Sequence, residues 1–223
     1  VTLVPMDPFY RIRFDDGTWF DYSADEAKML DEVARFCPED VQGYLDFVQD
    51  AERCKTLGFE GLGSIAFDTL GDLIKAIPSF LKMGAWRSIY TLVAKHFSND
   101  KLRTVMSFHP LLIGGNPFSV TAAYALINSL ERTWGVHSAM GGTGAIVKAM
   151  VGLLESRGIQ LRCNAPVTQI RIENGKACGV ELQSGEFIAA DIVVSNADTA
   201  WTYKNLVAPQ HRRHWTNRKI ENG

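Results

Sequence analysis

The sequence contains little cysteine, and its four cysteines lie far apart, at Cys37, Cys54, Cys163 and Cys178. None forms a C-x-x-C pair, so their spacing predicts neither a metal site nor a dense disulfide framework. We therefore expect reduced thiols, as is typical of an intracellular protein, and no bound metal ion. No signal peptide is visible at the N-terminus either.

An excess of charge of one sign is also lacking. The 23 basic and 25 acidic residues leave a net charge of −2, which argues against nucleic-acid binding through bulk electrostatics. No apolar run reaches the roughly 18 residues that a membrane-spanning helix needs. What remains is a globular composition, with 46% hydrophobic and 22% charged residues over 223 positions.

The order of the remaining patterns predicts a mixed fold of helices and strands. Residues 9–22 alternate in polarity around the turn Asp15-Asp16-Gly17, which predicts a β-hairpin. Helical spacing dominates from residue 23 to residue 154. Further on, a β-meander is predicted, followed by one buried parallel strand of the Rossmann type, from the segments 161–164, 167–172, 177–182, 186–188 and 191–194.

Capping residues and glycines mark where the helices begin and end. Ser23 with Glu26 predicts a capping box, Asp68 or Thr69 is expected to cap the amphipathic helix that follows, and Ser98 a shorter one. A Gly-rich break at 58–63 contains a G-x-G-x-x-A pattern. No strand precedes that pattern and no acidic residue follows at the right distance, so we predict a flexible loop there and no dinucleotide site.

The most unusual stretch is Ser107–Phe118, which combines apolar bulk with two glycines and two prolines. A helix cannot run through it, because proline removes a backbone donor and blocks the preceding turn. Such a composition suits a pocket wall or a close approach of the backbone to a ligand. A buried structural loop explains the same composition almost as well.

This stretch, together with several others, resembles the bacterial-type carotenoid desaturases, and among them the phytoene desaturases. The resemblance extends over nearly the whole chain. The motifs that carry it are Pro8–Arg11, Ala85–Tyr90, Ser107–Phe118, Tyr124–Ile127, Leu130–Arg132, Trp134–Val136, Gly141–Ala145, Asn164–Val167, Gly179-Val180, Asp191 and Ser195–Asp198.

The resemblance implies an α/β fold, in which an α+β insertion interrupts the Rossmann-type FAD domain of an amine-oxidase-like flavoprotein. Residues 1–140 would then be the helical, substrate-binding and membrane-facing part with its N-terminal hairpin. Residues 141–200 would belong to the FAD-binding domain, with the β-meander. Residues 201–223 would begin the return to the substrate domain and break off there.

The same resemblance implies the residues of the site. The strand at Val167 and the turn at Ser195, Asn196 and Ala197 would bind FAD. Family members often carry an Arg-Asp pair where this chain has Gly71-Asp72, so Asp72 is the catalytic candidate for proton movement, although helical spacing places it off the apolar stripe. The pocket-wall candidates for the substrate are His109, Gly114, Gly115, Asn116, Phe118 and Trp134.

The function implied is FAD-dependent dehydrogenation of a long isoprenoid hydrocarbon, a phytoene-like carotenoid, with a hydride going to the flavin. Three alternatives remain open: a diapocarotenoid desaturase, a carotenoid ketolase, and a non-catalytic truncated product. This chain is expected to be inactive without the rest of the protein. Product analysis would separate the enzymatic alternatives.

A hydrocarbon substrate and the lack of a spanning helix together imply a cytoplasmic enzyme that binds the membrane surface peripherally. The segment Leu70–Met83, with Lys75 and Lys82, is the candidate interfacial helix. A helix packed on its own core is the alternative for this segment. Whether the protein forms a homo-oligomer stays open.

Overall fold

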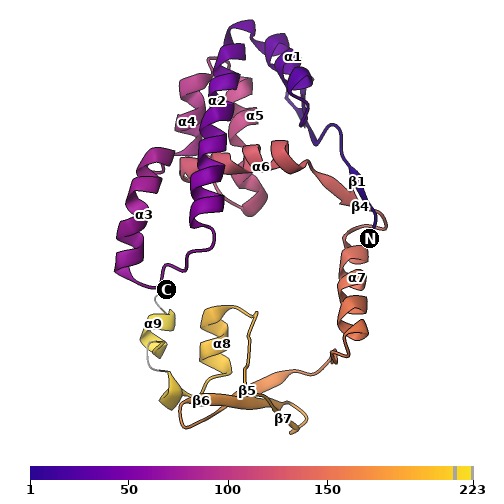
Figure 1. The fold of residues 1–223 in the computed structure, drawn as a ribbon, viewed down its shortest axis with the longest axis vertical. Helices are drawn as coiled ribbons and strands as arrows, with labels where there is room; N and C mark the ends of the chain where they lie inside the picture. The colour runs from indigo at the N-terminus through magenta and orange to yellow at the C-terminus, as the bar shows by residue number, and fades with distance from the viewer. Residues whose placement is uncertain (213–214, 222–223) are drawn as a thin grey trace. The chain divides into compact units, whose positions relative to one another are not determined.

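The computed structural model describes residues 1–212 and 215–221, and it divides into two compact units, Val1–Val147 and Lys148–Gly223 (Figure 1). The described residues form a mixture of helices and strands, as predicted. The roles predicted for regions 1–140, 141–200 and 201–223 stay predictions. Residues 213–214 and 222–223 of the last region lie outside the described residues.

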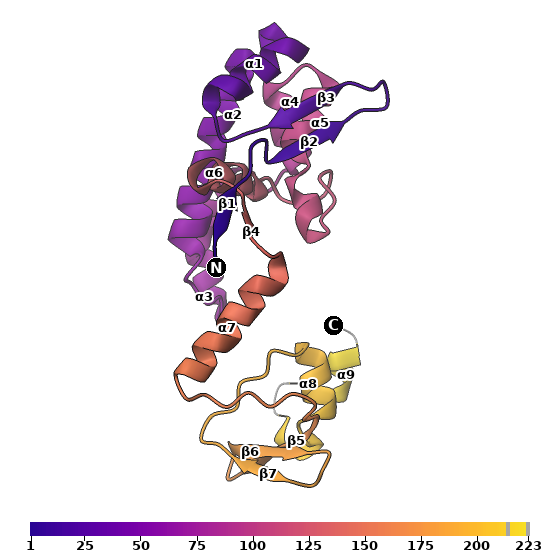
Figure 2. The same cartoon turned by 90° about the vertical axis from the view of Figure 1, so that its right-hand side faces the viewer.

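The predicted N-terminal hairpin is confirmed. Strands β2 (Tyr10–Arg13) and β3 (Trp19–Tyr22) pair antiparallel, and Gly17 takes a φ of +82° in the turn between them. Strand β1 (Leu3–Pro5) pairs separately with β4 (His137–Ala139), which ties the start of the chain to the end of the first unit (Figure 2).

The first helices follow the predicted order, but one cap differs. Helix α1 (Glu26–Phe36) is capped by Asp25, which accepts hydrogen bonds from the backbone of Ala27 and Lys28. The predicted capping box at Ser23 is wrong, because the Ser23 hydroxyl donates instead to Oδ1 of Asp7. A 3-10 turn, η1 (Pro38–Asp40), then opens α2 (Val41–Cys54).

The Gly-rich break predicted at 58–63 is not a flexible loop. Helix α2 continues into a π-helix, η2 (Lys55–Leu62), and Gly58 packs closely there, since a Cβ would lie 3.3 Å from Sδ of Met83. The element that precedes the G-x-G-x-x-A pattern is therefore helical. This agrees with the prediction that the pattern is no dinucleotide site.

Most of the remaining helices of the first unit pack against α2 (Figure 1). Asn99 caps the fifth helix, so the predicted cap at Ser98 is wrong, whereas Thr69 caps the third as expected. The helices are α3 (Leu70–Met83), α4 (Ile89–His96), α5 (Asp100–Ser107), the 3-10 turn η4 (Ala122–Ala125) and α6 (Leu126–Trp134). The fully buried side chains of the first unit include Tyr22, Tyr44, Phe20, Phe47, Phe97, Ile89 and Leu102.

Helix α7 (Thr143–Ser156) begins and ends near the predicted positions, and none of its described residues is buried. The predicted meander is confirmed as β5 (Val167–Glu173), β6 (Lys176–Leu182) and β7 (Phe187–Ala189), paired antiparallel in that order. Three short helical elements follow: α8 (Thr199–Asn205), η5 (Pro209–His211) and α9 (Asn217–Glu221).

Two predicted strands are absent from the described residues. Segment 161–164 and the apolar run 191–194, expected as the Rossmann-like strand, have no regular structure. Ile192 and Val194 are 80% and 86% exposed. A strand is stabilised by backbone hydrogen bonds to a neighbouring strand, and no described strand pairs with either segment.

Candidate functional site

The unusual stretch Ser107–Phe118 builds the wall of a pocket in the first unit. A 3-10 helix, η3 (His109–Ile113), ends at Gly114, whose φ of +75° favours glycine. Gly115 is equally constrained, because a Cβ there would lie 2.8 Å from Cγ2 of Val120. The pocket encloses about 430 Å³ and is lined by Tyr90, Thr104, Ser107, Phe108, Leu111, Gly114, Gly115, Asn116, Pro117 and Phe118.

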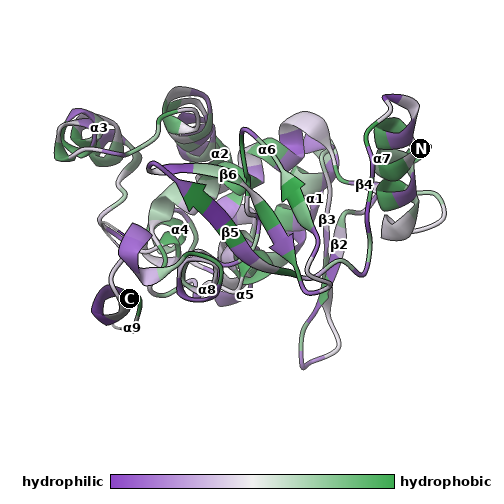
Figure 3. Ribbon diagram, turned by 90° about the horizontal axis from the view of Figure 1, so that it is seen from below, coloured by the Kyte–Doolittle hydropathy of each residue, from purple (hydrophilic) through white to green (hydrophobic). Residues whose placement is uncertain are grey.

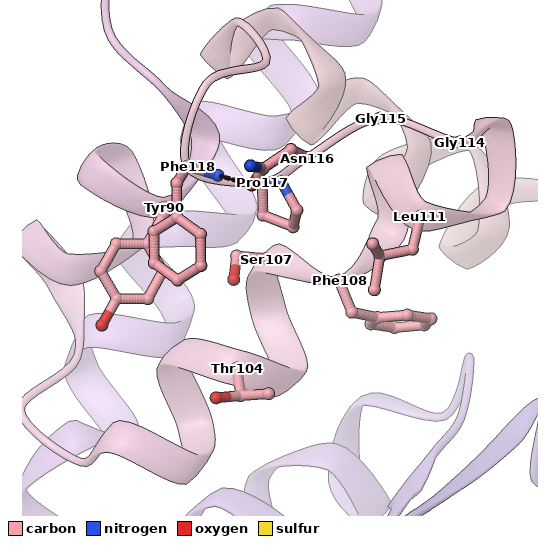
Figure 4. Close-up of a pocket in the computed structure, with 10 residues that line it drawn as sticks. All are labelled: Tyr90, Thr104, Ser107, Phe108, Leu111, Gly114, Gly115, Asn116, Pro117 and Phe118. Carbon is pink, nitrogen blue, oxygen red and sulfur yellow. Dashed lines mark hydrogen bonds between the residues drawn. The ribbon is translucent and has the colours of Figure 1, made fainter.

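Apolar side chains lie on two opposite sides of this pocket (Figure 4). The rings of Tyr90 and Phe118 lie together, 4.5 Å apart between centroids, and Phe108 and Leu111 lie across from them. A volume of about 430 Å³ falls within the range of small-molecule sites, about 300–1,000 Å³.

The polar groups of the pocket are largely occupied by their own backbone. The hydroxyl of Thr104 donates to the carbonyl of Asp100 at 3.0 Å, and that of Ser107 donates to the carbonyl of Arg103 at 2.7 Å. Oδ1 of Asn116 accepts from the backbone N–H of Phe118 at 3.0 Å. With these groups occupied, the pocket is suited to a ligand without polar atoms.

The structure places the predicted pocket residues unequally. Gly114, Gly115, Asn116 and Phe118 do line the pocket, whereas His109 and Trp134 are not among its lining residues. His109 is fully buried, and its Nε2 lies 3.2 Å from Oε2 of Glu131.

Trp134 lies on the surface. Its side chain is 60% exposed and packs edge-on against Phe59 of the π-helix η2, at 5.8 Å between ring centroids. It forms an exposed apolar surface together with Phe59, which is 48% exposed.

Asp72 lies at the start of α3 and completes its capping box. Its Oδ2 accepts hydrogen bonds from the backbone N–H of Thr69 at 3.2 Å and from the Thr69 hydroxyl at 2.7 Å. The Thr69 hydroxyl oxygen in turn accepts from the backbone N–H of Asp72. The sequence predicted Asp72 as a catalytic candidate, and its hydrogen bonds in the structure are those of a helix cap.

A second pocket, of about 390 Å³, lies in the second unit beside α8. Of the predicted FAD residues, Ser195 and Ala197 line it, and Val167 and Asn196 are outside its lining. Hydroxyl groups are its main polar feature: Ser195 and Thr202 lie 2.9 Å apart between their oxygens, and Thr199 and Tyr203 are close by. Hydroxyl donors and a volume of this size fit part of a dinucleotide, such as its ribose or phosphate groups.

Six lining residues of the first pocket were not among the predicted site residues. Ser107, Phe108, Leu111 and Pro117 belong to the stretch predicted as a pocket wall, whereas Tyr90 and Thr104 lie outside it. Tyr90 stands in a motif of the resemblance but was not singled out, although an aromatic residue near an apolar run is a signal for a pocket wall. Thr104 carries no such signal, since it stands in an ordinary helical pattern and reaches the pocket only through packing. Within residues 1–212 and 215–221, no cluster of three or more His, Cys, Asp or Glu is arranged to hold a metal ion.

Comparison with known proteins identifies the family. A family model described as flavin containing amine oxidoreductase matches residues 3–223. The chain belongs to this family. FAD, the cofactor predicted from the sequence, is the cofactor that the family implies. The flavin-containing amine oxidoreductases are oxidoreductases, as predicted for this chain.

The relatives within this family confirm the resemblance to carotenoid desaturases. The chain is 44% identical over 221 residues to phytoene desaturase (neurosporene-forming) of Cereibacter sphaeroides, covering 99% of this chain and 43% of that protein. It is 38% identical over 211 residues to phytoene desaturase (lycopene-forming) of Pantoea ananas, covering 95% and 43%. It is 30% identical over 225 residues to a 4,4'-diapophytoene desaturase of a Methylomonas species, covering 98% and 43%. The chain thus spans less than half the length of these relatives.

Proposed function

We propose that the protein carrying this chain is an FAD-dependent carotenoid desaturase that dehydrogenates phytoene. The observation that carries the proposal is the apolar pocket along Ser107–Phe118, in which the hydroxyls of Thr104 and Ser107 donate to carbonyls of their own helix. A hydrocarbon without polar groups is held by apolar walls alone, and this pocket provides them. The relatives named as phytoene desaturases support the same substrate class.

FAD supplies the hydride acceptor in such a reaction. Within this chain, the residues of the second pocket, Ser195 and Ala197 with the hydroxyls near them, fit the polar part of the nucleotide. The same proposal includes a Rossmann-type FAD-binding fold for the region that contains the second pocket. The pocket residues Tyr90, Phe108 and Phe118 orient the hydrocarbon and exclude water from it.

The second part of the proposal concerns the membrane. Helix α3 turns its apolar side chains to the solvent: Leu70, Leu73, Ile74, Ile77 and Leu81 are 46–73% exposed. Figure 3 shows hydrophobic residues along this helix. No described helix is both long enough and apolar enough to cross a bilayer. An exposed apolar face flanked by Lys75 and Lys82 suits peripheral binding to a cytoplasmic membrane surface, where the hydrocarbon substrate is dissolved.

Expression of the full-length protein in a phytoene-producing host tests the desaturase proposal. We expect coloured polyenes, identified by chromatography, and a host that stays colourless contradicts it. The same product analysis separates phytoene from diapophytoene as the substrate. Size-exclusion chromatography of the purified protein reports whether it also self-associates.

A matched pair of variants tests the pocket itself. Leu111 and Leu112 are neighbours on η3, 60% and 54% exposed, and only Leu111 lines the pocket. Leu111→Asp places a charge on the apolar wall, and a bound hydrocarbon would remove water from that charge. We therefore expect conversion to fall by about tenfold or more, because an unpaired charge shielded from water costs several kcal/mol. Leu112→Asp should retain most of the activity. Equal losses in the two variants would remove the pocket from the proposal.

A further inference from the structure

Behind the pocket wall lies a buried polar cluster that the proposed reaction does not use. It consists of Tyr10 on β2, His109 on η3 and Glu131 on α6, and we call it the buried trio. Tyr10 donates a hydrogen bond to Oε1 of Glu131 at 2.5 Å, and Nε2 of His109 lies 3.2 Å from Oε2. The side chains of His109 and Glu131 are 1% and 11% exposed.

The buried trio is energetically unfavourable, because some of its buried polar atoms are unpaired. The 3.2 Å contact is not aligned for a hydrogen bond, so Oε2 of Glu131 and both ring nitrogens of His109 have no hydrogen-bond partner among the described residues. Burial, and then the hydrogen bond to Glu131, raise the pKa of Tyr10, which keeps the phenol protonated as a donor. Buried polar groups with incomplete pairing contribute little to stability. We therefore look for the role of the buried trio in the side chains that it holds in place.

Phe108 connects the trio to the pocket. Its side chain lines the pocket (Figure 4), and its ring also packs 5.4 Å from Tyr10 and 4.4 Å from His109 between centroids. The Glu131 carboxylate contacts both of these neighbours through its two oxygens. A carboxylate outside the pocket thus contacts the two residues against which the pocket-lining ring of Phe108 packs.

We propose that Glu131 is a positioning residue, which holds Phe108 through Tyr10 and His109 and thereby sets the affinity of the pocket for an isoprenoid hydrocarbon. This inference rests on the proposed function. Without Glu131, the ring of Phe108 gains freedom to enter the pocket and compete with the ligand. Substrate binding weakens, whereas the hydride step is expected to keep its rate, because none of the three residues lines the pocket.

Kinetics of the full-length, FAD-loaded protein test this inference. We expect Glu131→Leu to raise the apparent KM for phytoene in liposomes by about fivefold, the effect of losing one buried hydrogen bond, with kcat within about twofold of the wild type. Glu131→Gln keeps an acceptor for Tyr10, so its KM should lie between the two. Tyr10→Phe should raise KM as well, and it is the second test if Glu131→Leu does not fold.

Ser129→Ala is the matched control. Ser129 is buried on the same helix, and its hydroxyl donates a hydrogen bond to Glu52 rather than to the trio. This variant should lose stability without a change in KM. If it raises KM as much as the trio variants do, or if the trio variants lower kcat with KM unchanged, the positioning role is refuted.

Binding of tritiated squalene from detergent micelles separates this inference from the proposed function. Squalene is an isoprenoid hydrocarbon, and its binding needs the pocket but no turnover. If the wild type fails to convert phytoene, the proposed function is refuted. The positioning role of the buried trio is then tested by squalene binding alone. A Kd that rises about fivefold in Glu131→Leu supports the positioning role, and an unchanged Kd overturns it.

Discussion

The carboxylate of Asp72 accepts two hydrogen bonds from Thr69, and these bonds occupy the group that the sequence singled out for proton movement. At the scale of single residues, a carboxylate near the start of a helix is most often satisfied by the free N–H groups there. The residue type alone does not separate this use from catalysis. The hydrogen-bond partners of Asp72 are those of a cap, and its catalytic role stays a prediction.

We therefore predict that Asp72→Ala behaves as the loss of a cap. The free energy of unfolding should fall by roughly 0.5–2 kcal/mol, as in other helix-cap removals. The rate constant kcat should stay within about threefold, whereas loss of a general base costs about 10²–10⁴-fold. Thr69→Ala is the control, because it breaks the same cap without touching the carboxylate. If Asp72→Ala alone abolishes turnover, Asp72 is catalytic after all.

Asp40 is a carboxylate with a structural role that the sequence did not predict, whereas for Asp72 the sequence suggested a catalytic role. It is 3% exposed and accepts hydrogen bonds from the backbone of Ser98 at 2.8 Å, the Ser98 hydroxyl at 2.9 Å and the backbone of Asn99 at 2.9 Å. It thereby joins the end of η1 to the start of α5. Burial raises the pKa of Asp40, and the hydrogen bonds from Ser98 and Asn99 outweigh burial, so the net pKa lies below 3.8.

The pH dependence of stability follows from that lowered pKa. A carboxyl group whose pKa is depressed by folding stabilises the protein above the unfolded value, and the contribution is lost as the pH falls through the folded value. Asp40→Asn should lower the free energy of unfolding by roughly 2 kcal/mol at pH 7. Its difference from the wild type should shrink below about pH 4. Urea denaturation at both pH values measures this, with Asp100→Asn, at an exposed position, as the control.

At the scale of elements, local sequence patterns correctly predicted the elements that local interactions determine. The hairpin around Asp15-Asp16-Gly17 and the meander β5–β7 rest on turns and alternation, and both are present. The run 191–194 has the composition of a buried strand, yet a strand needs a neighbour, which sequence composition does not supply. The π-helix η2 was missed for a similar reason, because Gly58 is there to let Met83 approach.

The site was predictable to the same extent. The glycines and prolines of Ser107–Phe118 announce an irregular wall, and most of its predicted residues do line the pocket. His109 has the same sequence context and lies behind the wall, because the turn of η3 directs it toward Glu131. Which side of an irregular segment faces a cavity depends on packing from other elements. The sequence therefore located the wall without separating its two sides.

At the same scale, we predict that helix α3 contributes to membrane binding. Leu73 and Ile77 are 46% and 47% exposed on its apolar face. Replacing both with serine removes apolar area that would enter a bilayer, at about 1.5–3 kcal/mol for each fully buried side chain. We expect binding of the full-length protein to sedimented liposomes to fall by about tenfold or more. Trp19→Ser, at a 48% exposed position on β3, is the control and should bind as the wild type does.

At the scale of the whole chain, the buried apolar side chains are distributed unevenly. The first unit contains a continuous core that runs from the hairpin through α2, α4 and α5 to η4. In the second unit the described buried apolar residues are Leu182, Leu206 and Val207. Local stability follows the density of buried contacts, so the two units should differ in how often they open.

Helix α7, which crosses the boundary between the two units, tests the link between burial and opening. Val147, Met150 and Leu153 are 55–62% exposed, and a helix of 14 residues without tertiary packing is marginal in water. In the 223-residue chain, amide hydrogen exchange should therefore be slowest in α2 and α4 and fast in α7 and in residues 191–198. The same measurement on the full-length protein is the control, where slow exchange in α7 would show that further chain covers its apolar face. Equal protection of α2 and α7 in the shorter chain would mean that α7 is stable by itself, against the burial seen here.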